Sequence, residues 1–242
     1  MQAGSARDKG SDKHQSDKIG EFLATIQMFA GLPTNQLEAI AQVAVTQIYP
    51  KGEAIFWEGD EGRGFFIVVS GKVKVFKFSP EGKEQILQFF GPGEHFAEVP
   101  AFDGQCFPAS AAAVEPTQLL FFPRTSFMQL LQQHPNLAIG MLAIFARHLR
   151  RFAQLIENLA LKEVPGRLAA YLLYLSDRTD TSSEVELDIT KGQLAAFLGT
   201  IPETLSRVFS RLASDGLIEI NGSKIKILDR QRLTTLAGNR GT

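Results

Sequence analysis

The sequence has almost no cysteine and no long apolar run. Cys106 is the only cysteine among 242 residues, so we expect no internal disulfide and no iron–sulfur cluster held by the chain's own thiolates. No run of about 18 apolar residues, the length that crosses a membrane, is present, and the N-terminus lacks the apolar region of a signal peptide. We therefore expect a cytoplasmic protein with no membrane partner.

The sequence also lacks the motifs of common enzymes and a strong charge of one sign. It contains no glycine-rich phosphate loop, no metal-ligand cluster and no nucleophile motif. We expect no enzymatic activity, because one carboxylate close to one histidine, as in Glu98 and His95, is common in loops. The 25 Lys and Arg residues nearly balance the 26 Asp and Glu residues, so the overall charge does not identify a partner.

The first 18 residues lack the side chains that a packed structure needs. Residues 1–18 contain no aromatic and no branched aliphatic residue, and such a segment buries too little apolar surface to become ordered. We expect a disordered tail there. The rest of the chain has room for two domains, and 44% of all residues are hydrophobic, which is enough for packed cores.

The segment from Thr190 to Ser214 has the pattern of two helices joined by a tight turn. Ala195 is small enough for a helix crossing, Gly199 opens the turn, and Pro202 suits the first turn of the second helix. This pattern predicts a helix-turn-helix whose second helix faces DNA. The alternative is an ordinary helical hairpin with a solvated polar face.

Two short alternating runs follow this segment and favour the DNA-binding interpretation. Residues 217–220 and 224–227 flank Asn221-Gly222, which is a strong signal for a β-hairpin. With a helix expected over 166–177, the pattern predicts a winged helix-turn-helix domain over 164–242. The expected DNA-binding residues are Thr190, Lys191, Thr200, Glu203, Ser206, Arg207, Arg211 and Lys224.

Between Gln47 and Phe122, short alternating runs are separated by regularly placed glycines. Such spacing is typical of many short strands joined by tight turns, and hence of a β-sandwich or barrel-like roll. Short helices are expected before the roll, at about 19–30 and 34–44. We expect these elements to form one domain over 19–134.

A long helix is expected over 135–163. Along it, apolar or semi-polar residues recur at alternating spacings of four and three residues, which is the heptad seam of a coiled coil. We therefore expect a homodimer joined by this helix. The alternative is a helix whose apolar face lies on the chain's own roll. The expected interface residues are Met141, Phe145, His148, Phe152, Leu155 and Leu159.

One stretch, from Gly52 to Glu98, resembles the cyclic-nucleotide-binding roll: GEAIFWEGDEGRGFFIVVSGKVKVFKFSPEGKEQILQFFGPGEHFAE. Because a long helix and a winged helix follow it, residues 19–236 resemble the CRP/FNR family of bacterial transcription regulators. The FAE form of the loop, the LxLK ending at 159–162 and PETxSR at 202–207 are similar to the branch related to the dissimilatory nitrate respiration regulator. The resemblance implies an α+β fold with an effector-sensing roll, a dimerisation helix and a winged helix-turn-helix. It also implies a homodimer that acts on double-stranded DNA with RNA polymerase.

The expected effector pocket departs from the cyclic-nucleotide sensors of this family. In those sensors an Arg-Ser or Arg-Thr pair holds the cyclic phosphate, but Phe107-Pro108 stands in that place, and no Lys or Arg occurs from Val99 to Pro123. A buried phosphate without its charged partner costs several kcal/mol, so we expect cyclic AMP to bind weakly or not at all. Phenylalanines at this loop suit an apolar, planar ligand instead. The expected pocket residues are Phe96, Ala97, Glu98, Phe102, Phe107 and Pro108.

The branch resemblance further implies a haem-based sensor of nitric oxide or of redox state. Histidine is the usual axial ligand of haem iron, and His148, followed by His95, is the candidate. For His148 the alternative is a polar residue that sets the register of the helix seam. The sequence thus predicts a ligand-responsive DNA-binding regulator. A cyclic-nucleotide-responsive or an effector-independent regulator of the same fold is the alternative.

Overall fold

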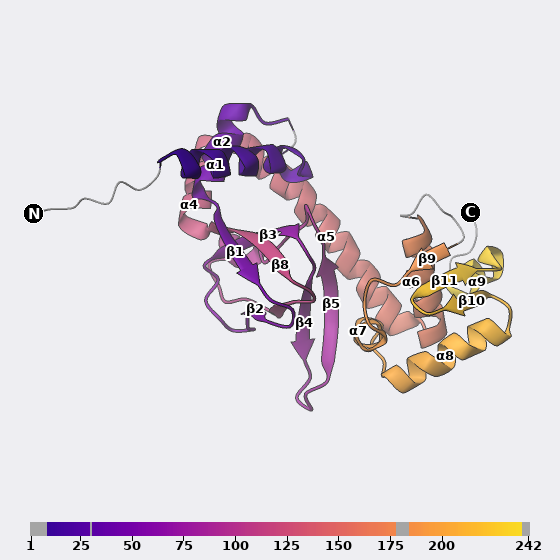
Figure 1. Cartoon of the computed structure of the whole chain (residues 1–242). Helices are drawn as coiled ribbons and strands as arrows, with labels where there is room; N and C mark the ends of the chain where they lie inside the picture. The colour runs from indigo at the N-terminus through magenta and orange to yellow at the C-terminus, as the bar shows by residue number, and fades with distance from the viewer. Residues whose placement is uncertain (1–8, 30, 178–183, 239–242) are drawn as a thin grey trace, which may run out of the picture. The chain divides into compact units, whose positions relative to one another are not determined.

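The computed structural model of the protein describes residues 9–29, 31–177 and 184–238 (Figure 1). The chain divides into two compact units. The first unit comprises residues 1–75 and 89–148, and the second comprises residues 76–88 and 149–242.

The β-roll is made of two sheets. Within the part of the chain that the structure describes, one four-stranded sheet has the order β1 (Val45–Tyr49), β8 (Thr117–Pro123), β3 (Gly64–Ser70), β6 (His95–Phe96). The other has the order β2 (Ala54–Phe56), β7 (Ser110–Ala113), β4 (Val73–Phe78), β5 (Glu84–Phe90). This arrangement confirms the roll predicted from the glycine spacing.

Strand β3 divides the core of the first unit into two clusters. Its residues from 64 to 68 are all buried, as expected for a central strand with both faces covered. Because successive side chains point to opposite faces of a strand, Phe65 and Ile67 belong to one apolar cluster, and Phe66 and Val68 belong to the other. The first cluster lies under helices, and the second fills the inside of the roll.

Helices cover the first of these clusters. They are α1 (Lys9–Ala24), the 3-10 turn η1 (Gln27–Phe29), α2 (Thr34–Val43), α4 (Arg124–Gln133) and the start of α5 (Pro135–Leu161). A further short helix, α3 (Val99–Asp103), follows β6. In Figure 1 the indigo helices α1 and α2 lie beside the first half of α5. None of the helices in the described ranges is both long and apolar enough to cross a membrane.

The disordered tail expected over 1–18 is wrong for residues 9–18, because α1 begins at Lys9. Residues 1–8 lie outside the described residues. Phe22 and Leu23 pack into the core at the other end of α1. Once such a helix is nucleated by packing, each added turn costs little even when its residues are polar. The composition of 1–18 alone does not reveal this, because the apolar anchor lies after residue 18.

Helix α5 places three of the six predicted interface residues against the chain's own roll. Met141 is 1% exposed within the chain's own core, Phe145 packs edge-on against Phe102 with ring centroids 5.1 Å apart, and His148 bonds to Glu98. These side chains face their own roll, which is the alternative considered for the seam. Of the other predicted interface residues, Phe152 is exposed, Leu155 is half-buried, and Leu159 lies close to the Gly199 turn of the second unit.

A different stripe of α5 is left exposed. Ile139, Leu142, Leu149 and Ile156 are each at least 66% exposed. Their spacings of three, seven and seven residues place them along one side of the helix, because seven residues complete almost two turns. The heptad pattern of the sequence therefore contains two apolar faces, and the first half of the predicted seam, from Met141 to His148, belongs to the inner one.

The second unit is a winged helix. Its elements are α6 (Val164–Asp177), β9 (Glu184–Glu186), α7 (Lys191–Phe197), α8 (Pro202–Ser214), β10 (Ile218–Asn221), β11 (Lys224–Ile227) and α9 (Arg230–Leu236). The predicted hairpin is confirmed, with Asn221 opposite Lys224 and Gly222 at φ 64°. Strand β9 pairs with β11 and completes a sheet of order β10-β11-β9. Figure 1 shows this sheet and α8 in orange and yellow.

Candidate functional site

The helix-turn-helix is fixed by local chemistry at its two helix starts. Thr190 caps α7 by accepting a hydrogen bond from the backbone N–H of Gln193, and the Gln193 side chain accepts one from the backbone N–H of Thr190. Gly199 then takes a left-handed φ of 64° in the turn, and Pro202 opens α8. These are the positions predicted from the sequence.

Helix α8 has one buried and one exposed side. It buries Leu205 and Phe209 in the second unit, whereas Glu203, Ser206 and Arg207 are exposed on the other side. The three exposed residues occupy positions i, i+3 and i+4, so they share one face of the first two turns. Among the described residues, the Arg207 guanidinium makes one side-chain hydrogen bond, which Nη2 donates to Thr204 Oγ1 at 3.1 Å.

The other predicted DNA-binding residues surround this face or lie on the wing. Lys191 Nζ lies 5.8 Å from the ring centre of Phe209, which places the start of α7 beside α8. Arg211 Nε is 3.8 Å from Asp215, and Lys224 Nζ on the wing is 3.4 Å from Glu184. Such exposed ion pairs contribute little and leave the cations available to phosphate. Thr190 is exposed and Thr200 half-buried.

The six residues of the predicted effector pocket do not line one site. Phe96 and Phe107 are buried inside the roll, where Phe107 stacks on Phe56 with ring centroids 3.8 Å apart. Phe102 belongs to the other cluster and Pro108 is exposed. Phe96 and Phe107, two of the three phenylalanines expected to hold an apolar ligand, thus fill the roll with their own rings. This inward packing is not visible in the sequence.

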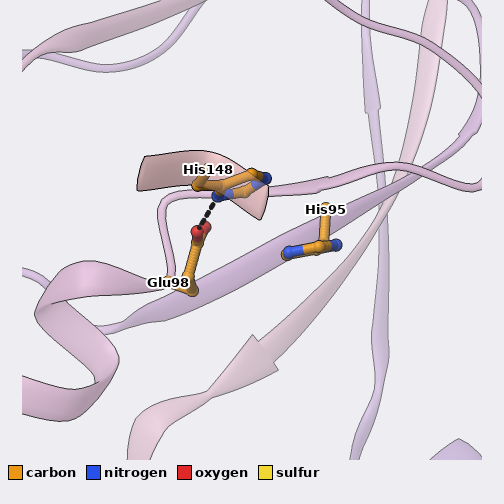
Figure 2. A group of neighbouring side chains, drawn as sticks. All are labelled: His95, Glu98 and His148. Atoms are coloured by element: carbon orange, nitrogen blue, oxygen red, sulfur yellow. Dashed lines mark hydrogen bonds and ion pairs between the residues drawn. The ribbon is translucent and has the colours of Figure 1, made fainter. Parts of the chain in front are cut away.

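Three residues of the roll and of α5 instead converge in one buried cluster. His95 comes from β6, Glu98 from the turn just before α3, and His148 from α5, and Figure 2 shows all three side chains directed toward one another. His148 Nδ1 donates a 2.7 Å hydrogen bond to Glu98 Oε1. The imidazoles of His95 and His148 are nearly parallel, at 17°, with centroids 5.1 Å apart. One potential metal-binding atom of each residue lies within 4.8 Å of the other two.

The backbone between His95 and Glu98 is strained. Ala97 has a φ of 65°, and no other non-glycine residue in the described ranges has a positive φ. This conformation costs an L-residue about 1–2 kcal/mol. It turns the chain sharply after β6, so that a strand residue and a loop residue meet at the same point. Strain of this kind persists where the surrounding structure holds a functional geometry.

Glu98 is a buried carboxylate that remains anionic. It is 4% exposed. Burial alone raises the pKa of the Glu98 carboxyl, but the hydrogen bond from His148 and the charges of His95 and His148 outweigh burial, so its pKa lies below the usual value. A buried anion needs a cationic partner nearby, since an uncompensated buried charge costs several kcal/mol. His148, whose Nδ1 lies 2.7 Å from Glu98 Oε1, is that partner in this structure.

Sequence reasoning named all three cluster residues but did not bring them together. His95 and His148 were candidates for a haem ligand, and Glu98 was a pocket residue. His95 and Glu98 are three residues apart, but His148 lies 50 residues after Glu98. The exposed apolar stripe of α5, which sequence reasoning missed, did leave a signal, namely apolar residues at 142, 149 and 156.

Comparison with protein-family models gives two matches. Residues 46–134 match the cyclic nucleotide-binding domain, and residues 166–236 match the Crp-like helix-turn-helix domain. The first range contains the roll with His95 and Glu98, and the second contains α7, α8 and the wing.

Similar proteins extend over most of the chain. The cyclic AMP receptor protein of Thermus thermophilus is 32% identical over 210 residues, which cover 87% of this chain and 96% of that protein. The transcriptional activator protein anr of Pseudomonas aeruginosa is 32% identical over 194 residues, covering 78% of this chain and 79% of that protein. The solved structure of FixK2 from Bradyrhizobium japonicum is 28% identical and superposes with a TM-score of 0.71, covering 80% of this chain and 97% of that one.

Proposed function

The chain belongs to the CRP/FNR family of DNA-binding transcription regulators, and we propose that it acts as an effector-responsive homodimer on palindromic promoter DNA. The observation that supports this proposal most is the exposed face of α8. A helix that buries Leu205 and presents Glu203, Ser206 and Arg207 to solvent has the form of a recognition helix. RNA polymerase is the further partner that the family resemblance implies.

The residues of α8 suggest which bases are read. Arg207 has the reach and the two-pronged donor group to bond the O6 and N7 atoms of guanine, and Glu203 accepts from the N4 amine of cytosine. The E-x-x-S-R arrangement is similar to that of FNR-type regulators, which favour TTGAT-like half-sites. Pro202 stands where the CRP type has a further base-reading arginine, so the preference of that type is not expected.

Phosphate contacts would come from the cations around this helix. Lys191, Arg211 and Lys224 are exposed and lie on α7, α8 and the wing. Contacts of this kind position a protein on the duplex but carry no base preference. The N-cap residue Thr190 and the turn residue Thr200 are further candidates for backbone contacts.

The homodimer would form through the exposed stripe of α5. This stripe exposes four large apolar side chains to water, which is unfavourable: Ile139, Leu142, Leu149 and Ile156. Their near-heptad spacing allows the same helix of a second copy to cover them. A two-fold dimer presents two recognition helices and requires two inverted half-sites about one helical turn, or ~34 Å, apart.

We infer that cyclic AMP is not the effector, because buried Phe107 stands where a cyclic phosphate needs a basic residue. Haem is what the branch resemblance implies. A porphyrin leaves only two coordination positions of its iron open to other ligands, one on each side of the ring. The imidazoles of His95 and His148 are stacked with centroids 5.1 Å apart, so they do not fit these two positions together, and at most one of these two histidines would bind the iron.

Fluorescence anisotropy tests the DNA-binding proposal. A labelled duplex of about 30 base pairs with two inverted TTGAT half-sites is compared with the same duplex carrying one scrambled half-site. The protein should bind the duplex with two intact half-sites more tightly than the duplex with one scrambled half-site. Arg207→Ala should cost about 1–3 kcal/mol and lose discrimination at one base pair, whereas Lys224→Ala should weaken both duplexes equally. If wild-type protein binds both duplexes with the same affinity, the proposed half-site recognition is wrong.

A further inference from the structure

We propose that His95, Glu98 and His148 bind one divalent first-row transition-metal ion. Two imidazole nitrogens and one carboxylate oxygen form the donor set, and these side chains leave further positions on the ion open to a small ligand. The inference depends on the proposed function only where it assigns the ion a regulatory role.

The distances suit an ion after a small adjustment. Two ligands about 2.1 Å from the same ion, at right angles, lie about 3.0 Å apart. His148 Nδ1 and Glu98 Oε1 are already 2.7 Å apart, so an ion can replace the proton that they share, and that proton leaves to solvent. His95 supplies the third ligand from within 4.8 Å and needs the larger movement.

The arrangement of the three side chains favours a bound metal ion over an ion pair between Glu98 and His148 alone. The 2.7 Å hydrogen bond joins Glu98 to His148, and a second imidazole, that of His95, stacks beside His148 with ring centroids 5.1 Å apart, so two imidazoles and one carboxylate lie together. An ion pair between Glu98 and His148 alone gives no reason for the strained backbone at Ala97, which brings His95 and Glu98 to the same point. Two neutral imidazoles and one carboxylate around a divalent ion would leave a net charge of +1.

The donor chemistry narrows the choice of metal. Two nitrogens and one carboxylate oxygen suit Fe(II), Co(II), Ni(II) or Zn(II), whereas Mg²⁺ and Ca²⁺ prefer oxygen ligands. Cys106, the thiol that would favour a softer metal, is exposed and is not part of the cluster. The buried rings of Phe90 and Phe96 lie nearby and limit water, since the Phe90 and His148 ring centroids are 6.4 Å apart.

The position of the cluster gives the ion a mechanical role. His95 and Glu98 belong to the β6–α3 segment of the roll, and His148 belongs to α5, which carries the exposed apolar stripe. A bound ion would fix α5 against the roll more firmly than one hydrogen bond does. Binding of a small ligand at an open position of the ion, or loss of the ion, would then change the position of α5 and thereby DNA affinity.

Cobalt(II) is the probe for this site, because its visible absorption reports nitrogen and oxygen ligands. Chelator-treated wild-type protein should bind one Co(II) per chain in both the absorption titration and calorimetry. His95→Ala, Glu98→Gln and His148→Gln should each lower the affinity by more than about 100-fold, because even loss of a hydrogen-bond partner behind a ligand costs about 10–100-fold. Circular dichroism checks that each variant is folded.

Two matched controls separate this site from adventitious binding. His134→Ala removes a half-buried histidine outside the cluster, and Cys106→Ser removes the exposed thiol. Both should bind Co(II) as the wild type does. No binding to wild-type protein, or binding that the three cluster variants leave unchanged, would overturn the inference. DNA affinity is measured separately on the same samples, so a protein that binds DNA but no metal refutes the metal site alone.

Discussion

Replacing Leu149 by alanine should weaken a homodimer without unfolding the chain. Leu149 is 70% exposed and lies in the middle of the apolar stripe of α5. Full burial of a leucine side chain contributes about 1.5–3 kcal/mol, so covering this exposed fraction contributes about 1–2 kcal/mol in each copy. In a two-fold dimer both copies bury the same residue. The loss is therefore about 2–4 kcal/mol, or about 30- to 700-fold in the dimer dissociation constant.

Sedimentation equilibrium over a range of protein concentrations measures this constant directly. Ile48→Ala is the matched control, because Ile48 is an equally exposed aliphatic residue, at 76%, but lies on β1 of the roll. The control should dimerise as the wild type does. If Leu149→Ala changes the dissociation constant by less than threefold, or if Ile48→Ala weakens the dimer as much, the exposed stripe is not the interface.

Three further predictions concern stability and the effector. Gly71→Ala should destabilise the chain by about 1–3 kcal/mol more than Gly59→Ala in urea unfolding. Both glycines have positive φ, but a Cβ at Gly71 would lie 2.5 Å from the carbonyl oxygen of Pro116 and from Thr117 Oγ1, whereas at Gly59 it meets open space. Equal losses would contradict this packing. Thr190→Ala removes the capping box of α7 and should lower the free energy of unfolding by about 1 kcal/mol, and a neutral result would show that the cap contributes nothing. Calorimetry should detect no sub-micromolar binding of cyclic AMP, because Phe107 fills the roll with an apolar ring; tight binding would restore the nucleotide-sensor interpretation.

The winged helix was predictable because its signals are local. Gly199 and Pro202 mark the turn and the start of α8 within a few residues, and Asn221-Gly222 marks the hairpin. Each signal depends on φ preferences and hydrogen bonding inside one short segment. Such preferences do not depend on how the rest of the chain packs.

The two faces of α5 were not separable from the sequence. Periodicity shows that Met141 and Leu142 both belong to apolar series, but it does not show which series meets the roll. The structure assigns Met141 to the core and leaves Leu142 exposed. The choice depends on tertiary packing, which decides which face of α5 contacts the roll.

The buried cluster was beyond sequence reasoning for a different reason. His148 meets Glu98 across 50 residues, and no local pattern encodes a contact at that separation. The left-handed backbone at Ala97 was equally unexpected, because alanine carries no preference for positive φ. Both features depend on how the roll and α5 pack together.

Selection of bound sequences from a random pool of DNA duplexes tests directly whether the protein is a dimeric regulator that reads DNA through α8. It makes no assumption about the half-site, and it reports base preference and symmetry together. The account predicts enrichment of an inverted repeat whose half-sites resemble TTGAT and lie about one helical turn, or ~34 Å, apart. Enrichment of a single unrepeated site, or of no sequence at all, would contradict a dimeric regulator that reads DNA through α8.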